Sequence, residues 1–266
     1  MNFSIIEIKE IVATVSMYKN MDYSGYGISF MKRRLTNIFE MYNIRKISQF
    51  YELIKEDYTR DRVIGEIFVE ATEMFRDPSF WRFLRDNVLK TIPTDTTIWF
   101  PSETSGHEIL SLAIMLKEMN LNDDIKIICN NPTNYCCNNI RKGILKTTNF
   151  EINHSNYKRL ENLDLFENYF TKDTNCYTAV KELTDSILCK QTDFTNAIED
   201  DKIALIFARN QALCFNHSFS AQYFKMLHEK LMPGGYIAIG IKEKMPTSTA
   251  DKMNVISETE KIFQKF

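Results

Sequence analysis

Apolar residues recur at helical spacing through the first quarter of the chain. The repeat is seen in Ile5, Ile8, Ile11 and Val12, and again in Phe30, Leu35, Ile38 and Phe39. Residues three or four positions apart lie on one face of a helix, so each run predicts a helix with one buried face. Breaks at 23–27 and 43–46 separate these helices. We therefore predict a small all-helical domain over residues 1–72.

A further helix, within residues 73–93, is predicted to link this domain to the rest of the chain. Asp77 and Pro78 are typical of a helix start, because aspartate can cap the first N–H groups and proline has no N–H to satisfy. Phe80, Trp81 and Leu84 then supply an apolar helix face.

Short apolar runs alternate with amphipathic helices after Pro93. Strands are expected at 97–100, 125–129, 203–207 and 236–240, and helices at 108–119, 135–142 and 218–230. The run from Ile203 to Phe207 is apolar at every position, which is typical of a strand covered on both faces in a parallel sheet. We predict an α/β fold over residues 94–245, with a doubly wound, mostly parallel sheet that binds ligands at the carboxyl ends of its strands.

Two segments fall outside this alternation. Short runs at 176–180 and 186–189 predict a small antiparallel insertion within about residues 150–194, with a helix at 161–170 beside it. Residues 246–266 are mainly polar and are predicted to form a frayed carboxyl-terminal tail.

Composition and charge exclude several classes of protein. Lys and Arg number 33 against 35 Asp and Glu, a net charge of -2, so no basic surplus favours nucleic acid or an acidic membrane. The chain has no run of about 18 apolar residues, and its charged amino terminus does not resemble a signal peptide. The six cysteines lack Cys-x-x-Cys spacing, which argues against a metal site or a disulfide framework. We expect a cytoplasmic protein.

Four sequence blocks occur in the order and spacing of one known family. They are Lys32-Arg33-Arg34-Leu35 with 48–52, then 72–77, then 98–113, and finally 206–210 with 213–216 and 233–240. Over about residues 24–245 these blocks resemble the chemotaxis receptor methyltransferase (CheR) family. The resemblance implies a helical domain ahead of an S-adenosylmethionine-dependent methyltransferase domain. It also implies methyl transfer to glutamates on the cytoplasmic helices of chemoreceptors.

The implied chemistry asks for alignment rather than proton transfer. A glutamate carboxylate has an unperturbed pKa of about 4.3 and is already a nucleophile at neutral pH. The sulfonium methyl is activated by the cofactor itself. Catalysis can therefore rest on positioning, and no general base is expected. By resemblance, Arg76 would lie near the reacting centre.

The same resemblance implies a set of binding residues. The cofactor would be held by Thr72, Arg76, Gly106, Glu108, Asn131, Asp193, Asn210 and Gln211, and an acidic receptor helix would dock on Lys32, Arg33 and Arg34. Glu108 could bind the cofactor's ammonium group by a charge-assisted hydrogen bond. Each assignment has a structural alternative: a surface ion pair for Arg76, a helix-start carboxylate for Glu108 and a turn residue for Asn210.

Several positions depart from the family pattern. Ser102 replaces a small residue or glycine, Asn131 the aspartate for the ribose, Asp193 an asparagine and Cys214 a tyrosine. His107 replaces a glutamate, and we interpret it as a solvated residue at a helix start. Three alternatives stay open: an active protein-glutamate methyltransferase, a pseudoenzyme that keeps the fold and binds its receptor, and a methyltransferase with another substrate.

Overall fold

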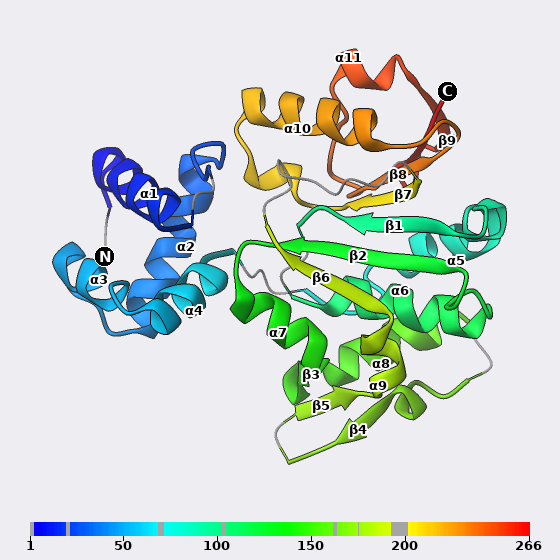
Figure 1. Ribbon diagram of the computed structural model, residues 1–266, viewed down its shortest axis with the longest axis horizontal. Helices are drawn as coiled ribbons and strands as arrows, with labels where there is room; N and C mark the ends of the chain where they lie inside the picture. Colours follow the sequence, from blue (N-terminus) through cyan, green and yellow to red (C-terminus); the bar gives the residue numbers. More distant parts are fainter. Residues whose placement is uncertain are drawn as a thin grey trace.

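A helical part precedes an α/β part along the chain (Figure 1). The computed structural model describes residues 3–19, 22–68, 72–102, 105–161, 164–174, 176–192 and 202–266. The helical part contains α1 (Ile5–Lys19), α2 (Ile28–Met41), α3 (Ile47–Leu53) and α4 (Asp57–Phe68). The apolar faces of these helices meet in a core of their own, which includes Ile11, Leu35 and Phe50. The helical grouping predicted from the spacing of apolar residues is therefore present.

Within the described residues, seven strands form the large sheet, in the order β6-β2-β1-β7-β8-β10-β9. Their bounds are β1 (Thr96–Phe100), β2 (Ile125–Asn131), β6 (Ile187–Gln191), β7 (Ile203–Ala208), β8 (Tyr236–Ile239), β9 (Met253–Ser257) and β10 (Ile262–Lys265). Strands β6 to β8 in this order run parallel, and β10 is antiparallel to both its neighbours. The prediction of a mostly parallel sheet is confirmed, with β7 in its interior.

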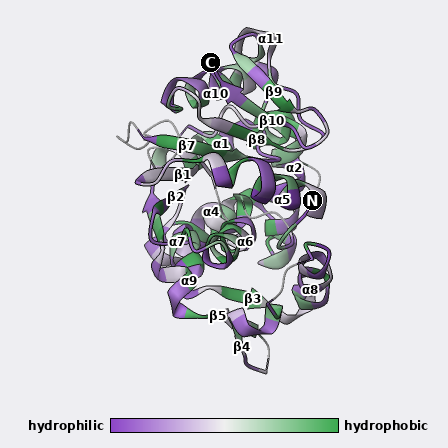
Figure 2. Ribbon diagram, turned by 90° about the vertical axis from the view of Figure 1, so that its right-hand side faces the viewer, coloured by the Kyte–Doolittle hydropathy of each residue, from purple (hydrophilic) through white to green (hydrophobic). Residues whose placement is uncertain are grey.

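Helices cover both faces of the large sheet. In β1, Ile98 and Phe100 point to one face and Trp99 to the other, as alternation along a strand requires. The first face packs against α5 (Pro78–Asn87), α6 (His107–Glu118) and α7 (Asn134–Lys142), and the second against α10 (His217–Lys230). Figure 1 shows α10 on one side of the sheet and α6 and α7 on the other. Figure 2 shows hydrophobic colouring along β7, which is buried at every residue.

The predicted linking helix α5 forms part of this layered structure. Phe80, Trp81 and Leu84 are fully buried in the core beneath the large sheet. Pro78 occupies the first turn, as predicted, but the side chain of Asp77 makes no capping hydrogen bond. Asp77 instead adopts a φ of 58° and forms an ion pair with Arg209, at 2.6 Å.

A small antiparallel sheet is present, but the insertion is arranged differently from the prediction. The sheet has the order β3-β5-β4, from β3 (Ile144–Lys146), β4 (Phe170–Lys172) and β5 (Cys176–Ala179). The run at 186–189 was expected there, yet it lies in β6 and pairs with β2 in parallel. Along β6 only alternate residues are buried, which resembles an antiparallel strand. The prediction of a helix at 161–170 is wrong, since that range contains only the short 3₁₀ helix η3 (Phe166–Tyr169) among its described residues. The α-helices of this region are α8 (Phe150–Lys158) and α9 (Lys181–Asp185).

The prediction of a frayed tail at 246–266 is also wrong. After a short helix, α11 (Thr247–Ala250), the chain returns to the large sheet as β9 and β10. Strand β10 pairs with β8, and Ile262 and Phe263 are buried. A β8 without this neighbour would leave a row of backbone N–H and C=O groups unpaired. No helix in the described part of the chain is long and apolar enough to cross a bilayer.

The helical and α/β parts make close contact between α4 and α7. Asp61 of α4 accepts a hydrogen bond from the backbone N–H of Tyr135, at 2.7 Å, in the first turn of α7. Gly65 faces the same turn, and a β-carbon there would come within 2.8 Å of Thr133 Oγ1. A glycine at this position therefore allows the two helices to approach closely.

Candidate active site

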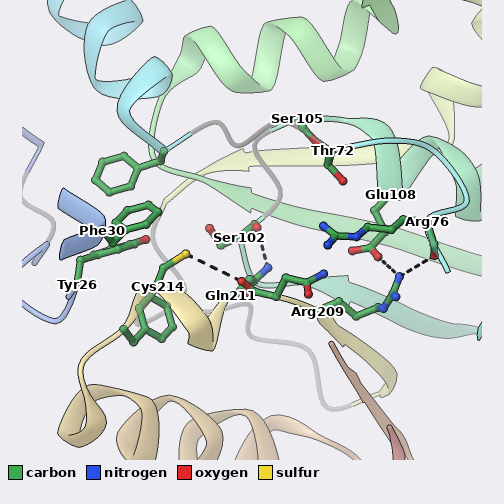
Figure 3. A pocket seen from close by; sticks show the side chains of 13 residues that line it. Tyr26, Phe30, Thr72, Arg76, Ser102, Ser105, Glu108, Arg209, Gln211 and Cys214 are labelled. Atoms are coloured by element: carbon green, nitrogen blue, oxygen red, sulfur yellow. Dashed lines mark hydrogen bonds and ion pairs between the residues drawn. The ribbon is translucent and has the colours of Figure 1, made fainter. Parts of the chain in front are cut away.

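One pocket opens at the carboxyl ends of β1 and β7, between the helical part and the α/β part (Figure 3). We call its two sides the polar end (Thr72, Arg76, Ser105, Glu108 and Arg209) and the aromatic end (Tyr26, Phe30, Phe68 and Phe215). Ser102, Asn210, Gln211 and Cys214 complete the wall. The structure thus places five of the predicted cofactor positions on one pocket: Thr72, Arg76, Glu108, Asn210 and Gln211.

Arg209 organises the polar end from the carboxyl end of β7. Its guanidinium is fully buried and forms ion pairs with Glu108 at 2.5 Å and with Asp77 at 2.6 Å. It also lies 4.0 Å from the ring centroid of Phe80. Arg209 was absent from the residues assigned to the site, although its place directly after a fully apolar strand was a signal for it.

Glu108 lies in the first turn of α6, which begins after Gly106. The φ of Gly106 is +82°, a conformation that glycine adopts without strain and that directs the chain into the helix. Burial raises the pKa of the Glu108 carboxyl, while Arg209 acts in the opposite direction. The helix start and Arg209 together favour the ionised form of this carboxyl. Gly106 shapes the turn and does not itself line the pocket.

Arg76 is the second cation of the polar end. Among the described residues its guanidinium has no hydrogen-bond or ion-pair partner, whereas its backbone carbonyl accepts hydrogen bonds from Arg209 and Trp81. Figure 3 shows the Arg76 side chain beside Glu108. An arginine and a glutamate side by side suit a zwitterionic amino-acid group, with its carboxylate toward Arg76 and its ammonium toward Glu108.

The turn after β7, residues 209–213, is braced from several directions. Gln211 donates a hydrogen bond to the carbonyl of Ser102 at 2.7 Å and accepts one from the Tyr223 hydroxyl. Glu243, which is 3% exposed, accepts hydrogen bonds from the backbone N–H groups of Asn210 and Ala212, both at 2.7 Å. Sequence reasoning missed Glu243, because the flanking lysines make this stretch read as solvated.

The aromatic end is built largely by the helical part of the chain. Tyr26 and Phe215 form an isolated antiparallel β-bridge, and the N–H of Gly27 donates to the carbonyl of Cys214 at 2.8 Å. The Tyr26 ring centroid lies 5.1 Å from that of Phe215, 5.5 Å from Phe30 and 4.9 Å from Phe68. No motif in the sequence indicated this wall, since the two segments are far apart in the chain.

Asn131 is not in the pocket, contrary to its expected role with the ribose. Its side chain is fully buried at the end of β2, and its amide donates to the sulfur of Cys189 at 3.3 Å. The amide oxygen of Asn131 has no partner among the described residues. The Asn131 side chain points inward because its amide donates to the cysteine sulfurs that lie beside the end of β2. Asp193 lies outside the described residues.

The residue His107 is half-buried and both of its ring nitrogens are buried, so its interpretation as a solvated residue is wrong. Neither ring nitrogen has a hydrogen-bond partner within the described chain. Burial lowers the pKa of His107 to about 4, and the imidazole is therefore neutral at physiological pH. The preceding glycine turn directs this side chain inward at the start of α6.

The three cations expected to dock a receptor differ in their surroundings. Arg34 donates to the carbonyls of Glu66 and Ile67, both at 2.6 Å, and so binds the carboxyl end of α4. Arg33 is exposed and its guanidinium lies 5.6 Å from the ring centroid of Phe30. Lys32 is partly exposed. Arg34 thus has a clear structural role, and the surface positions are Lys32 and Arg33.

Comparisons with known proteins agree with this geometry. Residues 70–262 match the family described as "CheR methyltransferase, SAM binding domain". "Putative methyltransferase Cher3" of Pseudomonas putida KT2440 is 21% identical over 264 residues, covering 98% of this chain and 97% of that protein.

Solved structures of other methyltransferases are more distant. The N-methyltransferase NodS from Bradyrhizobium japonicum WM9, in complex with S-adenosyl-L-homocysteine, has a TM-score of 0.40 and 9% identity, covering 82% of this chain and 97% of that one. The glycopeptide N-methyltransferase MtfA, complexed with S-adenosylmethionine, has a TM-score of 0.36 and 10% identity, covering 65% and 51%. The family match spans most of the chain and includes the whole polar end, so this protein belongs to the CheR methyltransferase family and its cofactor is S-adenosylmethionine.

Proposed function

We propose that this protein is a protein-glutamate O-methyltransferase that acts on the cytoplasmic helices of chemoreceptors. The observation that carries the proposal is the pocket lining: among its described residues, no histidine, lysine or unpaired carboxylate can take a proton. The carboxylate of Glu108 is engaged by Arg209. An acceptor that arrives already ionised needs no base, and a carboxylate meets that condition at neutral pH.

The side chains of the pocket would act by positioning. S-adenosylmethionine supplies a methyl group activated on a sulfonium. Arg76 and Glu108 would hold the amino-acid end of the cofactor at the polar end, next to the turn that carries Asn210. Tyr26 and Phe215, at the other end, would keep water away from the acceptor carboxylate. Alignment of this kind can account for a large part of a rate enhancement.

The exposed cations of α2 would guide the receptor. Arg33 stacks on Phe30, a residue of the aromatic end, so its charge lies beside the pocket rather than at a distance from it. An acidic helix that bound Lys32 and Arg33 would have its glutamates close to the opening. Cations of this kind mainly raise the rate of encounter and lose their effect at high salt.

The decisive experiment uses the purified protein, methyl-tritiated S-adenosylmethionine and a chemoreceptor cytoplasmic fragment. We expect label in the receptor that mild base releases as methanol, since glutamyl methyl esters hydrolyse in base. Arg76→Ala should lower kcat/KM by roughly a hundredfold, the loss typical when one stabilising donor is removed. A receptor fragment with its acceptor glutamates changed to alanine is the matched control. Base-stable label would point to another class of acceptor.

A second candidate function is favoured by Asn131. The Asn131 amide nitrogen donates to Cys189, and Asn131 is absent from the pocket lining, so the expected contact to the ribose would be lost. The chain could then bind its receptor without turning over the cofactor. Calorimetry with S-adenosylmethionine and with S-adenosylhomocysteine separates the two proposals: micromolar binding with labelled receptor supports the enzyme, and no binding of either ligand supports the receptor-binding protein.

A further inference from the structure

Glu243 is a buried carboxylate that no part of the proposed chemistry uses. It lies on the loop after β8 and is 3% exposed, although Lys242 and Lys244 on either side are exposed. Burying a charge is costly unless hydrogen bonds replace the lost water. The burial of Glu243 between two exposed lysines must therefore be offset by specific hydrogen bonds.

Backbone N–H groups provide these hydrogen bonds to Glu243. Its Oε2 atom accepts hydrogen bonds from the backbone N–H groups of Asn210 at 2.7 Å and Gly240 at 2.5 Å. Its Oε1 atom accepts one from the N–H of Ala212, at 2.7 Å. Successive backbone N–H groups in a turn form a concavity that binds anions, and here the anion belongs to the protein itself.

The turn that Glu243 fills is under steric constraint as well. Asn210 has a φ of +60°, in the left-handed region that non-glycine residues seldom adopt. On the opposite loop, a β-carbon at Gly240 would lie 2.5 Å from Asn210 Oδ1 and 2.9 Å from Asn210 N. The turn is therefore pressed between the β8 loop and the pocket, and its conformation depends on both.

The pocket side of the same turn carries binding residues. Asn210 and Gln211 line the pocket, and Arg209 precedes them with its ion pair to Glu108. We propose that Glu243 is a positioning residue for the cofactor: by holding the N–H groups of Asn210 and Ala212, it sets the turn conformation in which Asn210 meets S-adenosylmethionine. This inference rests on the cofactor pocket and not on the identity of the methyl acceptor.

The test is Glu243→Gln, which keeps the size of the side chain but replaces one acceptor oxygen with an amide donor that faces backbone N–H groups. We expect the Kd for S-adenosylmethionine, measured by calorimetry, to rise about tenfold, equal to about 1.4 kcal/mol. The melting temperature without cofactor should fall as well, because buried N–H groups lose an acceptor, so binding is compared at a temperature at which both proteins are folded. Lys244→Gln, on the same loop but exposed, is the control and should bind as the wild type does. A wild-type Kd for Glu243→Gln overturns the proposal.

A pH series adds a readout that a merely structural role would not move. Burial raises the pKa of Glu243 to about 6. As pH falls from about 8 to about 5, the wild-type carboxyl gains a proton, and the ratio of the Kd of Glu243→Gln to that of the wild type should fall toward one. Tyr223, the titratable side chain that interacts with Glu243 from α10, has its pKa raised well above the ordinary value and keeps its charge state throughout. A ratio that does not change with pH overturns the proposal.

Two further variants keep the test decisive if Glu243→Gln fails to fold. Gly240→Ala adds a methyl group that presses on both Asn210 and the Glu243 carboxylate without changing a charge, and it too should weaken cofactor binding. Unchanged binding by Gly240→Ala overturns the proposal. Asn210→Ala should also weaken binding. If it binds as the wild type does, the turn makes no contact with the cofactor and the positioning role fails, while cofactor binding by the family domain stands.

Discussion

At the scale of single residues, the polar end depends on buried charges that compensate each other. The positive charge of Arg209 is fully buried between the carboxylates of Glu108 and Asp77. The resemblance to the family led to Glu108 because that residue occupies a matching position. It did not lead to the arrangement around it, because pairing between residues 101 positions apart has no local pattern.

Arg209→Met should destabilise the fold by about 2 to 4 kcal/mol, because it leaves the partly buried carboxylates of Glu108 and Asp77 without their partner. Arg209→Lys keeps the charge but presents a compact ammonium that cannot bridge both acids as a planar guanidinium does, and it should recover only part of the loss. Urea denaturation measures the free energy of unfolding of both variants. A Lys variant as stable as the wild type would show that charge alone suffices here.

The buried imidazole of His107 predicts a dependence of stability on pH. Its folded pKa of about 4 lies below the ordinary 6.5. The unfolded state therefore binds a proton first on acidification, and the free energy of unfolding should fall between pH 6.5 and 4. The full effect is on the order of 3 kcal/mol.

His107→Leu should flatten this part of the profile, as measured by urea denaturation at several pH values. His217→Leu, at an exposed position in α10, should leave the profile as it is in the wild type. An unchanged slope in His107→Leu would mean that other groups cause the dependence.

At the scale of elements, the interior parallel strands were predictable, whereas the two edge strands and the antiparallel β10 were not. Strand β7 is buried at every residue, so its sequence is apolar throughout. Strands β6 and β9 lie at the two edges of the large sheet and bury only part of their residues. An edge strand with a mixed sequence resembles a loop or a hairpin, which explains the wrong assignments of β6 and β9. Strand β10 was missed because its short run, Ile262–Lys265, has only two apolar residues.

The contact of α4 with α7 gives a test at this scale. Gly65→Ala places a methyl group 2.8 Å from Thr133 Oγ1 and 2.9 Å from Tyr135 Cδ1. We expect a loss of about 1 to 3 kcal/mol from overpacking, even though alanine favours the helix by about 1 kcal/mol. Tyr58→Ala on the same helix, where the side chain is 72% exposed, should change stability by less than about 0.5 kcal/mol. Equal thermal melting curves for the two variants would contradict the close approach.

At the scale of the whole molecule, distant segments combine to make the sheet and the pocket. The end of the chain supplies β10 between β8 and β9, and Lys265 donates to the carbonyls of His228 and Leu231. The pocket joins Tyr26, Arg76 and Phe215, which come from three separate stretches of sequence. Family resemblance led to Thr72, Arg76 and Glu108 of the polar end because their motifs are local. It missed Arg209 and the aromatic end, because packing between distant parts of a chain leaves no motif.

Deleting residues 258–266 should prevent cooperative folding. It would expose the edge of β8 and remove the buried Ile262 and Phe263. Deleting Phe266 alone, which is 66% exposed, is the control and should have little effect. Ile262→Ala gives an intermediate case, with an expected loss of about 2 to 5 kcal/mol. Size-exclusion chromatography and thermal melting would report the outcome, and a monomeric, cooperatively melting truncation would contradict it.

The β-bridge between Tyr26 and Phe215 also bears on how such proteins can be recombined. Gly27 donates to Cys214 and Asn216 donates to Gly25, so a few backbone hydrogen bonds join the two parts at the wall of the pocket. In a chimaera that takes its helical part from one relative and its α/β part from another, the two segments that form these hydrogen bonds would come from different proteins. Residues 25–27 and 214–216 should therefore be exchanged together. A transplanted helical part would have to bring its own version of residues 214–216 with it.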